Sequence, residues 1–127
     1  MRTVMSSNTE ITRPGTLEYP NFMDKVNAVI QSNLTNPDFD IDHLSQSLTI
    51  SRMQLHRKLK AKTGISASHY IRQLRLREAK KLLSSTDWKI SKIAHQVGFR
   101  RPSWFTRCFV KAFGVSPSDY RLSGEND

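Results

Sequence analysis

Two arginines, Arg57 and Arg107, stand 50 residues apart, and each lies midway between two large apolar residues at positions i−2 and i+2. On a helix, with about 100° of rotation per residue, such an arginine points away from the face that its apolar neighbours bury. A planar guanidinium forms forked hydrogen bonds with guanine O6 and N7, or with phosphate oxygens. The spacing therefore predicts two outward-facing cations with the same chemistry, one in each half of the chain.

The sequence around each arginine is repeated. Residues 55–70 read LHRKLKAKTGISASHY and residues 105–120 read FTRCFVKAFGVSPSDY, with Arg, Gly, Ser, Ser and Tyr at matching places. A second match lies just before, at an offset of 49, where Ile41, Leu44, Ser45 and Leu48 correspond to Ile90, Ile93, Ala94 and Val97. Each half thus contains a helix, a tight joint and a second helix, with a small residue where the two helices must approach. This is the pattern of a helix-turn-helix.

Capping residues and glycines predict where the helices begin and end. The expected N-terminal caps are Asn21, Asp40 or Asp42, Ser51, Ser66 or Ser68, and Ser116, while Gly64 and Gly114 suit left-handed C-terminal caps. These signals predict an all-α fold in which a first helix-turn-helix (about 40–63) and a second one (about 89–113) are joined by a long helix (about 67–84). Residues 1–20 lack periodicity and read as a disordered tail or linker before a domain over 21–127.

The positive charge is concentrated in the middle of the chain. The net charge of +9 divides into three Lys/Arg against six Asp/Glu in residues 1–50, sixteen against two in 51–111, and one against three in 112–127. Such a concentration is expected of a surface that meets a polyanion. A solvated basic face kept for solubility is the alternative.

Other kinds of site find little support in the sequence. Four histidines occur without metal-ligand spacing, so neither a metal nor another cofactor is expected, and nothing indicates an enzyme. Cys108, the one cysteine, suits semi-buried packing. Trp88 and Trp104 would stack on bases in an RNA-binding protein, but their helical context favours packing between helices. No apolar run is long enough to span a membrane, no secretory signal is visible, and we expect a cytoplasmic protein.

The second half, KIAHQVGFRRPSWFTRCFVKAFGVSPSDYR, resembles the DNA-binding domain of AraC/XylS-type bacterial transcription regulators. The shared pattern is Ile-Ala, three residues, Gly-Phe, then a Tyr/Trp-Phe-x-Arg-x-Phe segment, Gly, Pro and Tyr-Arg. The first half, SRMQLHRKLKAKTGISASHYIRQLRLREAKKLL, is similar to the family as well, and the resemblance covers about residues 22–122. It implies seven helices, two helix-turn-helix units joined by a long helix, and sequence-specific binding at promoters.

The resemblance also implies roles for individual residues. The positions that read bases in the family fall on Met53, Gln54, His56, Arg57, Ser103, Thr106 and Arg107. Candidates for phosphate contacts, which position the protein without reading sequence, are Arg52, Lys60, Arg101 and Lys111. Arg101 stands where the family often has a capping Asp or Ser, so the helix that follows is expected to start without a side-chain cap. Val110 replaces a common Lys and removes one expected electrostatic contact.

The family usually adds a sensing or dimerising domain, and we expect this chain to be the C-terminal part of a longer protein. Residues 22–48 look like the segment that opens such domains in hybrid two-component regulators. The fragment is expected to be monomeric and its parent dimeric, with double-stranded DNA as the partner and RNA polymerase as a further one. Two other functions stay open at this point: a general nucleic-acid or RNA binder, and a protein-interaction module that docks an acidic partner.

Overall fold

The computed structural model describes residues 21–124, which fold into seven helices without a strand. The helices are α1 (Phe22–Ser32), α2 (Ile41–Leu48), α3 (Arg52–Thr63), α4 (Ala67–Ser85), α5 (Ile90–Gln96), α6 (Pro102–Phe113) and α7 (Pro117–Ser123). The predicted all-α fold is therefore confirmed. The tail expected over residues 1–20 lies outside the described residues.

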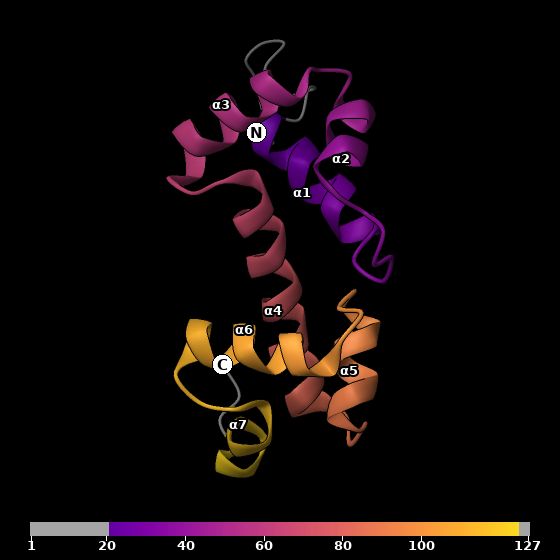
Figure 1. Ribbon diagram of the computed structural model, residues 1–127, viewed down its shortest axis with the longest axis vertical. Helices are drawn as coiled ribbons and strands as arrows, with labels where there is room; N and C mark the ends of the chain where they lie inside the picture. The colour runs from indigo at the N-terminus through magenta and orange to yellow at the C-terminus, as the bar shows by residue number, and fades with distance from the viewer. Residues whose placement is uncertain (1–20, 125–127) are drawn as a thin grey trace, which may run out of the picture.

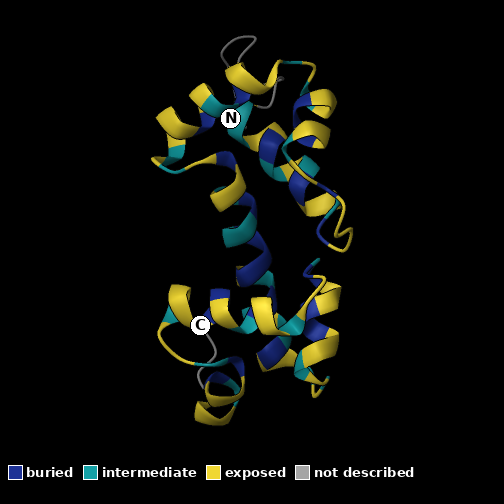
Figure 2. Ribbon diagram, in the orientation of Figure 1, coloured by how far each residue is buried: buried dark blue, intermediate teal, exposed yellow. Residues whose placement is uncertain are grey.

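The long helix α4 joins two groups of three helices (Figure 1). Helices α1, α2 and α3 gather around its N-terminal part, and α5, α6 and α7 gather around its C-terminal part. In this view α3 and α6 run in the same sense, one in each half, as expected of a direct repeat. Figure 2 shows that the middle of α4 is buried, so α4 is covered by both halves.

Each half has its own hydrophobic core. The first core is mostly aliphatic and is built from Val26, Ile30, Leu34, Phe39, Leu44, Leu55, Leu59, Ala67, Ile71 and Leu74. The second core is rich in aromatic residues and is built from Leu76, Ala79, Leu83, Ile93, Ala94, Val97, Phe99, Phe105, Cys108, Phe109 and Tyr120. The two cores have no residue in common, although α4 contributes side chains to both.

Most predicted caps form the expected hydrogen bonds. The side chains of Asn21, Asp40, Ser51, Ser66 and Ser116 each accept a hydrogen bond from the backbone N–H three residues later. Asp40 and Ser66 are thus the caps, rather than the alternatives Asp42 and Ser68. These contacts satisfy backbone donors that the first turn of a helix leaves unpaired, which fixes where each helix begins.

Two large side chains of α4, Tyr70 and Leu82, are only half-buried. Leu82 packs at the edge of the second core. Tyr70 packs at the edge of the first core, where its hydroxyl donates to Asn27 Oδ1 at 2.6 Å. A tyrosine needs a partner for its O–H when it leaves water, and this partner lies at the border of the core rather than inside it.

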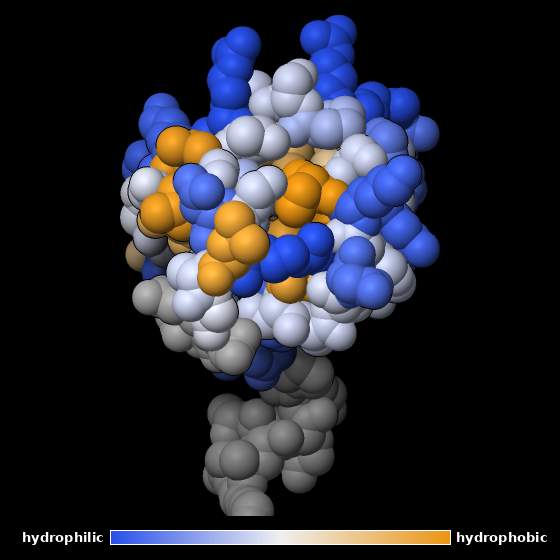
Figure 3. Space-filling view, turned by 90° about the horizontal axis from the view of Figure 1, so that it is seen from below, coloured by the Kyte–Doolittle hydropathy of each residue, from blue (hydrophilic) through white to orange (hydrophobic). Residues whose placement is uncertain are grey.

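The surface of the second half does not present one continuous apolar face in the view along the long axis (Figure 3). Apolar patches there are separated by hydrophilic side chains. Within residues 21–124 no helix has the length and apolar character needed to cross a bilayer. Hydrophilic side chains therefore make up much of the surface in this view (Figure 3).

Candidate nucleic-acid interface

The joint between α2 and α3 holds the first pair of helices at a fixed angle. After α2, Thr49 adopts the left-handed conformation with φ of 59°. Its N–H donates to the Gln46 carbonyl at 3.1 Å, and the N–H of Ile50 donates to the Ser45 carbonyl at 3.1 Å. This pair of hydrogen bonds is the Schellman motif, which ends a helix and turns the chain sharply. The buried Ser45 lets the two helices approach closely.

The joint between α5 and α6 repeats this geometry 49 residues later. Gly98, with φ of 90°, donates to the His95 carbonyl at 3.0 Å, and Phe99 N–H donates to the Ala94 carbonyl at 2.9 Å. The small residue Ala94, expected where the two helices approach, is fully buried. The same turn therefore follows α2 and α5, although the joint over residues 97–101 is longer than the joint over residues 49–51.

Helix α3 is anchored by Leu55 and Leu59, which are fully buried. Its outer face is strongly basic, with five cations and no acid over residues 52–63. The predicted reader Arg57 is exposed, Met53 is 71% exposed, and His56 is half-buried beside them. The orientation expected for Arg57, opposite its apolar neighbours, agrees with this burial pattern.

Helix α6 is anchored in the same way by Phe105 and Phe109, and Arg107 between them is exposed. Ser103 is exposed and Thr106 is half-buried. Three predicted phosphate contacts are exposed as well, Lys60 in the first half of the chain and Arg101 and Lys111 in the second. The first turn of α6 lacks a side-chain cap at Arg101, as expected, and begins with Pro102.

Trp104 corrects an interpretation made from the sequence. Its helical context favoured packing between helices, yet 47% of Trp104 is exposed. The buried face of α6 is filled by Phe105, Cys108 and Phe109, so Trp104 falls at the border of that face. There its ring lies under the Arg72 guanidinium of α4, whose central carbon is 5.9 Å from the ring centroid. Trp88, in contrast, packs against the second core.

A basic cleft lies between the two halves. It has a volume of about 590 Å³ and is bounded by the segment between α1 and α2, the N-terminal part of α4, the α5–α6 joint and the first turns of α6. Five arginines line it, namely Arg72, Arg75, Arg100, Arg101 and Arg107, and the described residues of its lining include neither Asp nor Glu. A low-dielectric cleft of one charge sign focuses the field and attracts the opposite charge. The cleft borders the first turns of α6, whereas no residue of α3 lines it. Two of its arginines also bind within the protein, Arg75 to main-chain carbonyls and Arg100 to Asp38.

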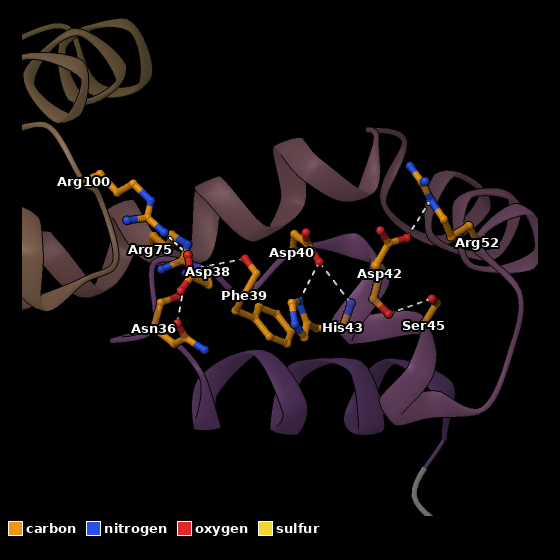
Figure 4. Close-up of polar contacts among 10 residues, drawn as sticks. All are labelled: Asn36, Asp38, Phe39, Asp40, Asp42, His43, Ser45, Arg52, Arg75 and Arg100. Atoms are coloured by element: carbon orange, nitrogen blue, oxygen red, sulfur yellow. Dashed lines mark hydrogen bonds and ion pairs between the residues drawn. The ribbon is translucent and has the colours of Figure 1, made fainter.

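Two of the predicted contact residues already have partners within the protein. The Gln54 side-chain carbonyl accepts a hydrogen bond from the Ser51 backbone N–H at 3.1 Å and completes a capping box. Arg52 Nε lies 3.1 Å from Asp42 Oδ1, and both side chains are more than half exposed (Figure 4). An exposed ion pair contributes little to stability, so Arg52 can exchange this carboxylate for another anion at small cost.

Few other groups offer chemistry. The described residues contain no group of three or more His, Cys, Asp and Glu side chains able to hold a metal ion. Burial raises the pKa of the Cys108 thiol, which favours the unreactive protonated form and fits the expected packing role. At the start of α2, the hydrogen bond from the His43 backbone N–H lowers the pKa of Asp40.

Two arginines that the sequence analysis passed over bind main-chain carbonyls. Arg75 is buried in α4, and Arg121 of α7 donates to the carbonyls of Leu83, Thr86 and Trp88. Leu83 lies in the last turn of α4, where carbonyls have no partner within the helix, and Thr86 and Trp88 lie in the segment that follows α4. The one sequence signal at Arg75 is its place between two apolar residues on a helix that is otherwise charged on its outer face.

Residues 44–123 match the family described as the helix-turn-helix domain. The histidine kinase P4 of Formosa agariphila is 37% identical over 99 residues, covering 78% of this chain and 7% of that protein. The HTH-type transcriptional activator RhaR of Yersinia pseudotuberculosis is 42% identical over 82 residues, covering 65% of this chain and 27% of that protein. The chain thus spans about a quarter or less of these two curated relatives.

Solved structures share the fold. The C-terminal domain of the two-component response regulator yesN from Fusobacterium nucleatum superposes with a TM-score of 0.71 at 33% identity, covering 76% of this chain and 93% of that one. The C-terminal domain of AraT, a response regulator from Geobacillus stearothermophilus, gives a TM-score of 0.73 at 33% identity, covering 78% and 82%. The DNA-binding domain of AdpA in complex with a target DNA gives 0.73 at 27% identity, covering 78% and 88%.

Proposed function

The chain belongs to the AraC-type helix-turn-helix family of DNA-binding transcription regulators, and on that premise we propose that it reads double-stranded DNA in a sequence-specific manner. In the proposed complex α3 and α6 enter two successive segments of the major groove on one side of the duplex, about 34–36 Å apart. The major groove is the site because its base edges carry a distinguishable pattern of donors and acceptors.

The observation that supports this proposal best is that Arg57 and Arg107 occupy equivalent, outward-facing positions on α3 and α6. Both side chains are exposed, both lie between two fully buried residues of the same helix, and both helices follow the same Schellman joint. The arginine-lined cleft between the halves adds to this support, because the phosphate backbone between two major-groove segments would pass there.

The proposed roles follow the two kinds of contact. Base edges are read by Met53, Gln54, His56, Arg57, Ser103, Thr106 and Arg107, while phosphates are bound by Arg52, Lys60, Arg101 and Lys111. The aligned reading positions carry different side chains apart from the two arginines, so the two half-sites differ in sequence and do not form a palindrome. One chain supplies both reading helices, and we therefore expect one chain per site. Binding to chromosomal DNA would occur in the cytoplasm, where RNA polymerase is a further candidate partner.

The test begins with selection of bound sequences from a random pool of duplexes. A selected duplex should then compete at least about 10³-fold better than random duplex. Arg107→Ala should cost about 1–3 kcal/mol at one base position, and Arg57→Ala should do the same in the other half-site. Lys25→Ala, a cation removed from α1 outside both helix-turn-helix pairs, is the matched control and should leave base preferences unchanged.

The same measurements separate the alternatives. Equal competition by random duplex would identify a general nucleic-acid binder. A uniform loss over all sequences for Arg107→Ala would make Arg107 a phosphate contact and not a reader. The absence of any salt-dependent binding to duplex DNA would leave the protein-interaction module, since phosphate contacts release counterions and weaken steeply with salt.

A further inference from the structure

Arg75 lies in the middle of α4 and is 6% exposed, at the level where the two halves meet. Its Nη1 donates to the Leu34 carbonyl at 2.6 Å and to the Val97 carbonyl at 2.9 Å. Its Nη2 donates to the carbonyls of Asn36 at 3.2 Å and Phe39 at 3.4 Å. Three of these acceptors belong to the segment between α1 and α2, and the fourth follows α5. One side chain therefore binds both halves of the molecule.

The Leu34 and Val97 carbonyls lie just beyond the C-terminal ends of α1 and α5, where a positive charge is stabilising. Leu34 comes two residues after the end of α1, and Val97 directly follows α5. Carbonyls at a helix C-terminus lack partners within the helix and carry a partial negative charge. A guanidinium is planar and has five donors in a fixed fork, so Arg75 can satisfy a helix end in each half at once. Lysine, with a single ammonium group, cannot copy this geometry.

Gly98 provides the space for this contact. A Cβ at Gly98 would overlap Arg75 Nη1 and lie 2.5 Å from the Leu34 carbonyl oxygen. The left-handed conformation alone does not demand glycine in this joint, because Thr49 adopts it at the equivalent place in the first half. The glycine therefore leaves room for the Arg75 guanidinium and for the Leu34 carbonyl that accepts from it.

Further contacts connect the same parts of the molecule. Arg100 of the α5–α6 joint pairs with Asp38 of the segment between α1 and α2, next to the Arg75 contacts (Figure 4). Both side chains are exposed, so this pair contributes little by itself. The two hydrophobic cores have no residue in common, which leaves α4 and the Arg75 contacts to set how the halves are placed.

We propose that Arg75 is a positioning residue that fixes the two helix-turn-helix pairs relative to each other and thereby sets the base-pair spacing between the half-sites. The proposal rests on the proposed function for its DNA consequence. Each base pair added between two half-sites moves the second groove by about 3.4 Å and rotates it by about 34–36°, since a turn of 34–36 Å holds about 10–10.5 base pairs. A protein with fixed heads cannot follow that displacement, whereas a protein with loosely joined heads can.

The first experiment measures the distance between the halves without DNA. Spin labels are attached at Ser47→Cys in α2 and Ser118→Cys in α7, in a Cys108→Ala background, and pulsed electron paramagnetic resonance records the distribution. We expect a narrow distribution for the labelled parent, a clearly broader or shifted one for Arg75→Met, and an intermediate one for Arg75→Lys. An unchanged distribution in Arg75→Met would overturn the proposal.

Two glycines provide a matched pair of variants. Gly98→Ala should broaden the distribution because the new methyl group displaces the Arg75 guanidinium. Gly114→Ala places the same strain on a residue with φ of 82°, but no atom lies within 4 Å of its added Cβ. Gly114→Ala should therefore keep the parent distribution. Equal broadening in both variants would attribute the effect to backbone strain and would contradict the role of Arg75.

The second experiment uses the selected duplex and versions with one or two base pairs inserted between the half-sites. The parent should lose about 100-fold or more in affinity on insertion, the loss expected when two linked heads can no longer bind together. In Arg75→Met the ratio between native and inserted sites should fall below about 10-fold. A variant that is only less stable would lose affinity on all duplexes by one factor and keep the ratio, which would count against the proposal.

The two experiments fail in different ways. If the parent shows no spacing preference while Arg75→Met still broadens the distance distribution, the two-groove function is wrong and the positioning role stands. If Arg75→Met does not fold, as judged by thermal melting, Arg75→Lys and Gly98→Ala decide the matter by the same ratio and the same distribution.

Discussion

The two helix-turn-helix pairs share one backbone joint but begin their helices differently. In the first pair both helices start at side-chain caps, Asp40 for α2 and Ser51 for α3. In the second pair Lys89 and Arg101 stand at those positions and provide no capping hydrogen bond. Pro102 at the first turn of α6 offsets part of this difference, since it has no N–H to leave unpaired.

The cores behind the two reading helices differ as well. The first helix is anchored by leucines among aliphatic neighbours, and the second by phenylalanines in a network of edge-to-face and tilted rings. The aligned surface positions are equally unlike, with Gln54 opposite Trp104 and Lys60 opposite Val110. The repeat thus preserves the backbone path and the outward arginine, while caps, core and neighbouring surface differ between the two halves.

The difference between the two cores should appear most strongly in the free energy of unfolding. Phe109→Ala removes a ring whose centroid lies 5.8 Å from that of Phe105, 4.7 Å from that of Phe113 and 5.9 Å from that of Tyr120. The lost burial should cost about 3–5 kcal/mol, and each lost ring pair about 0.5–1.5 kcal/mol more. Its counterpart Leu59→Ala should cost about 2–5 kcal/mol without any ring contribution. Urea denaturation compares the two, and an equal or greater loss for Leu59→Ala would mean that the rings add nothing.

The difference in caps predicts opposite changes of smaller size. Ser51→Ala removes the capping box of α3 and should lower the free energy of unfolding by about 1 kcal/mol. Arg101→Ser adds a capping hydroxyl to α6 and should raise it by up to about 1 kcal/mol. Thermal and urea denaturation measure both. A loss of stability in Arg101→Ser would show that the second pair depends on this arginine in the folded protein.

The aligned positions 60 and 110 carry Lys and Val, and a substitution at either one tests what this difference does to DNA binding. On the proposed function, Lys60→Gln should reduce the slope of log affinity against log salt concentration by about 1, since one phosphate contact is lost. Val110→Lys should increase the slope by a similar amount if the second helix approaches the backbone as the first one does. Lys25→Gln on α1 is the control and should leave the slope unchanged.

The smallest effect is a dependence on pH that only the first pair should show. The pKa of Asp40 is lowered in the folded protein, so its contribution to stability is present above the unfolded pKa, about 3.9, and is lost as pH falls through the folded value. Asn also caps helices well but does not titrate. The free energies of unfolding of the parent and Asp40→Asn should therefore agree at pH 7 and differ below about pH 4, with the parent falling further. If the free energies of unfolding of the two proteins changed in parallel with pH over that range, the charge of Asp40 would not stabilise the start of α2.

Much of the fold follows from local signals in the sequence. Caps such as Ser51 and Ser116 act on a donor three residues away, and Gly64 and Gly114 end the helices that precede them, so a short window of sequence contains both partners. The repeat then placed Arg57 and Arg107 on equivalent helices, and their base-reading roles stay predictions. The helices could be predicted because each signal and its effect lie within a few residues.

The residues that the sequence did not reveal act over longer separations. The acceptors of Arg75 lie between 22 and 41 residues away, and those of Arg121 between 33 and 38. Apart from its place between Leu74 and Leu76, no local pattern distinguishes the buried Arg75 from a charged residue on the outer face. Trp104 was misread for a related reason, because its exposure depends on how far Phe105 and Cys108 already fill the space behind α6.

The shared sense of α3 and α6 has a consequence for how a bound chain would sit on a gene. Two unlike halves that follow one another along a duplex give the complex a direction along the DNA. A twofold-symmetric dimer has no such direction, because it looks the same from either end. On the proposed function, whatever the protein presents at its front would always face the same neighbouring promoter. Turning the operator around would leave affinity unchanged and aim the protein at the gene on the other flank.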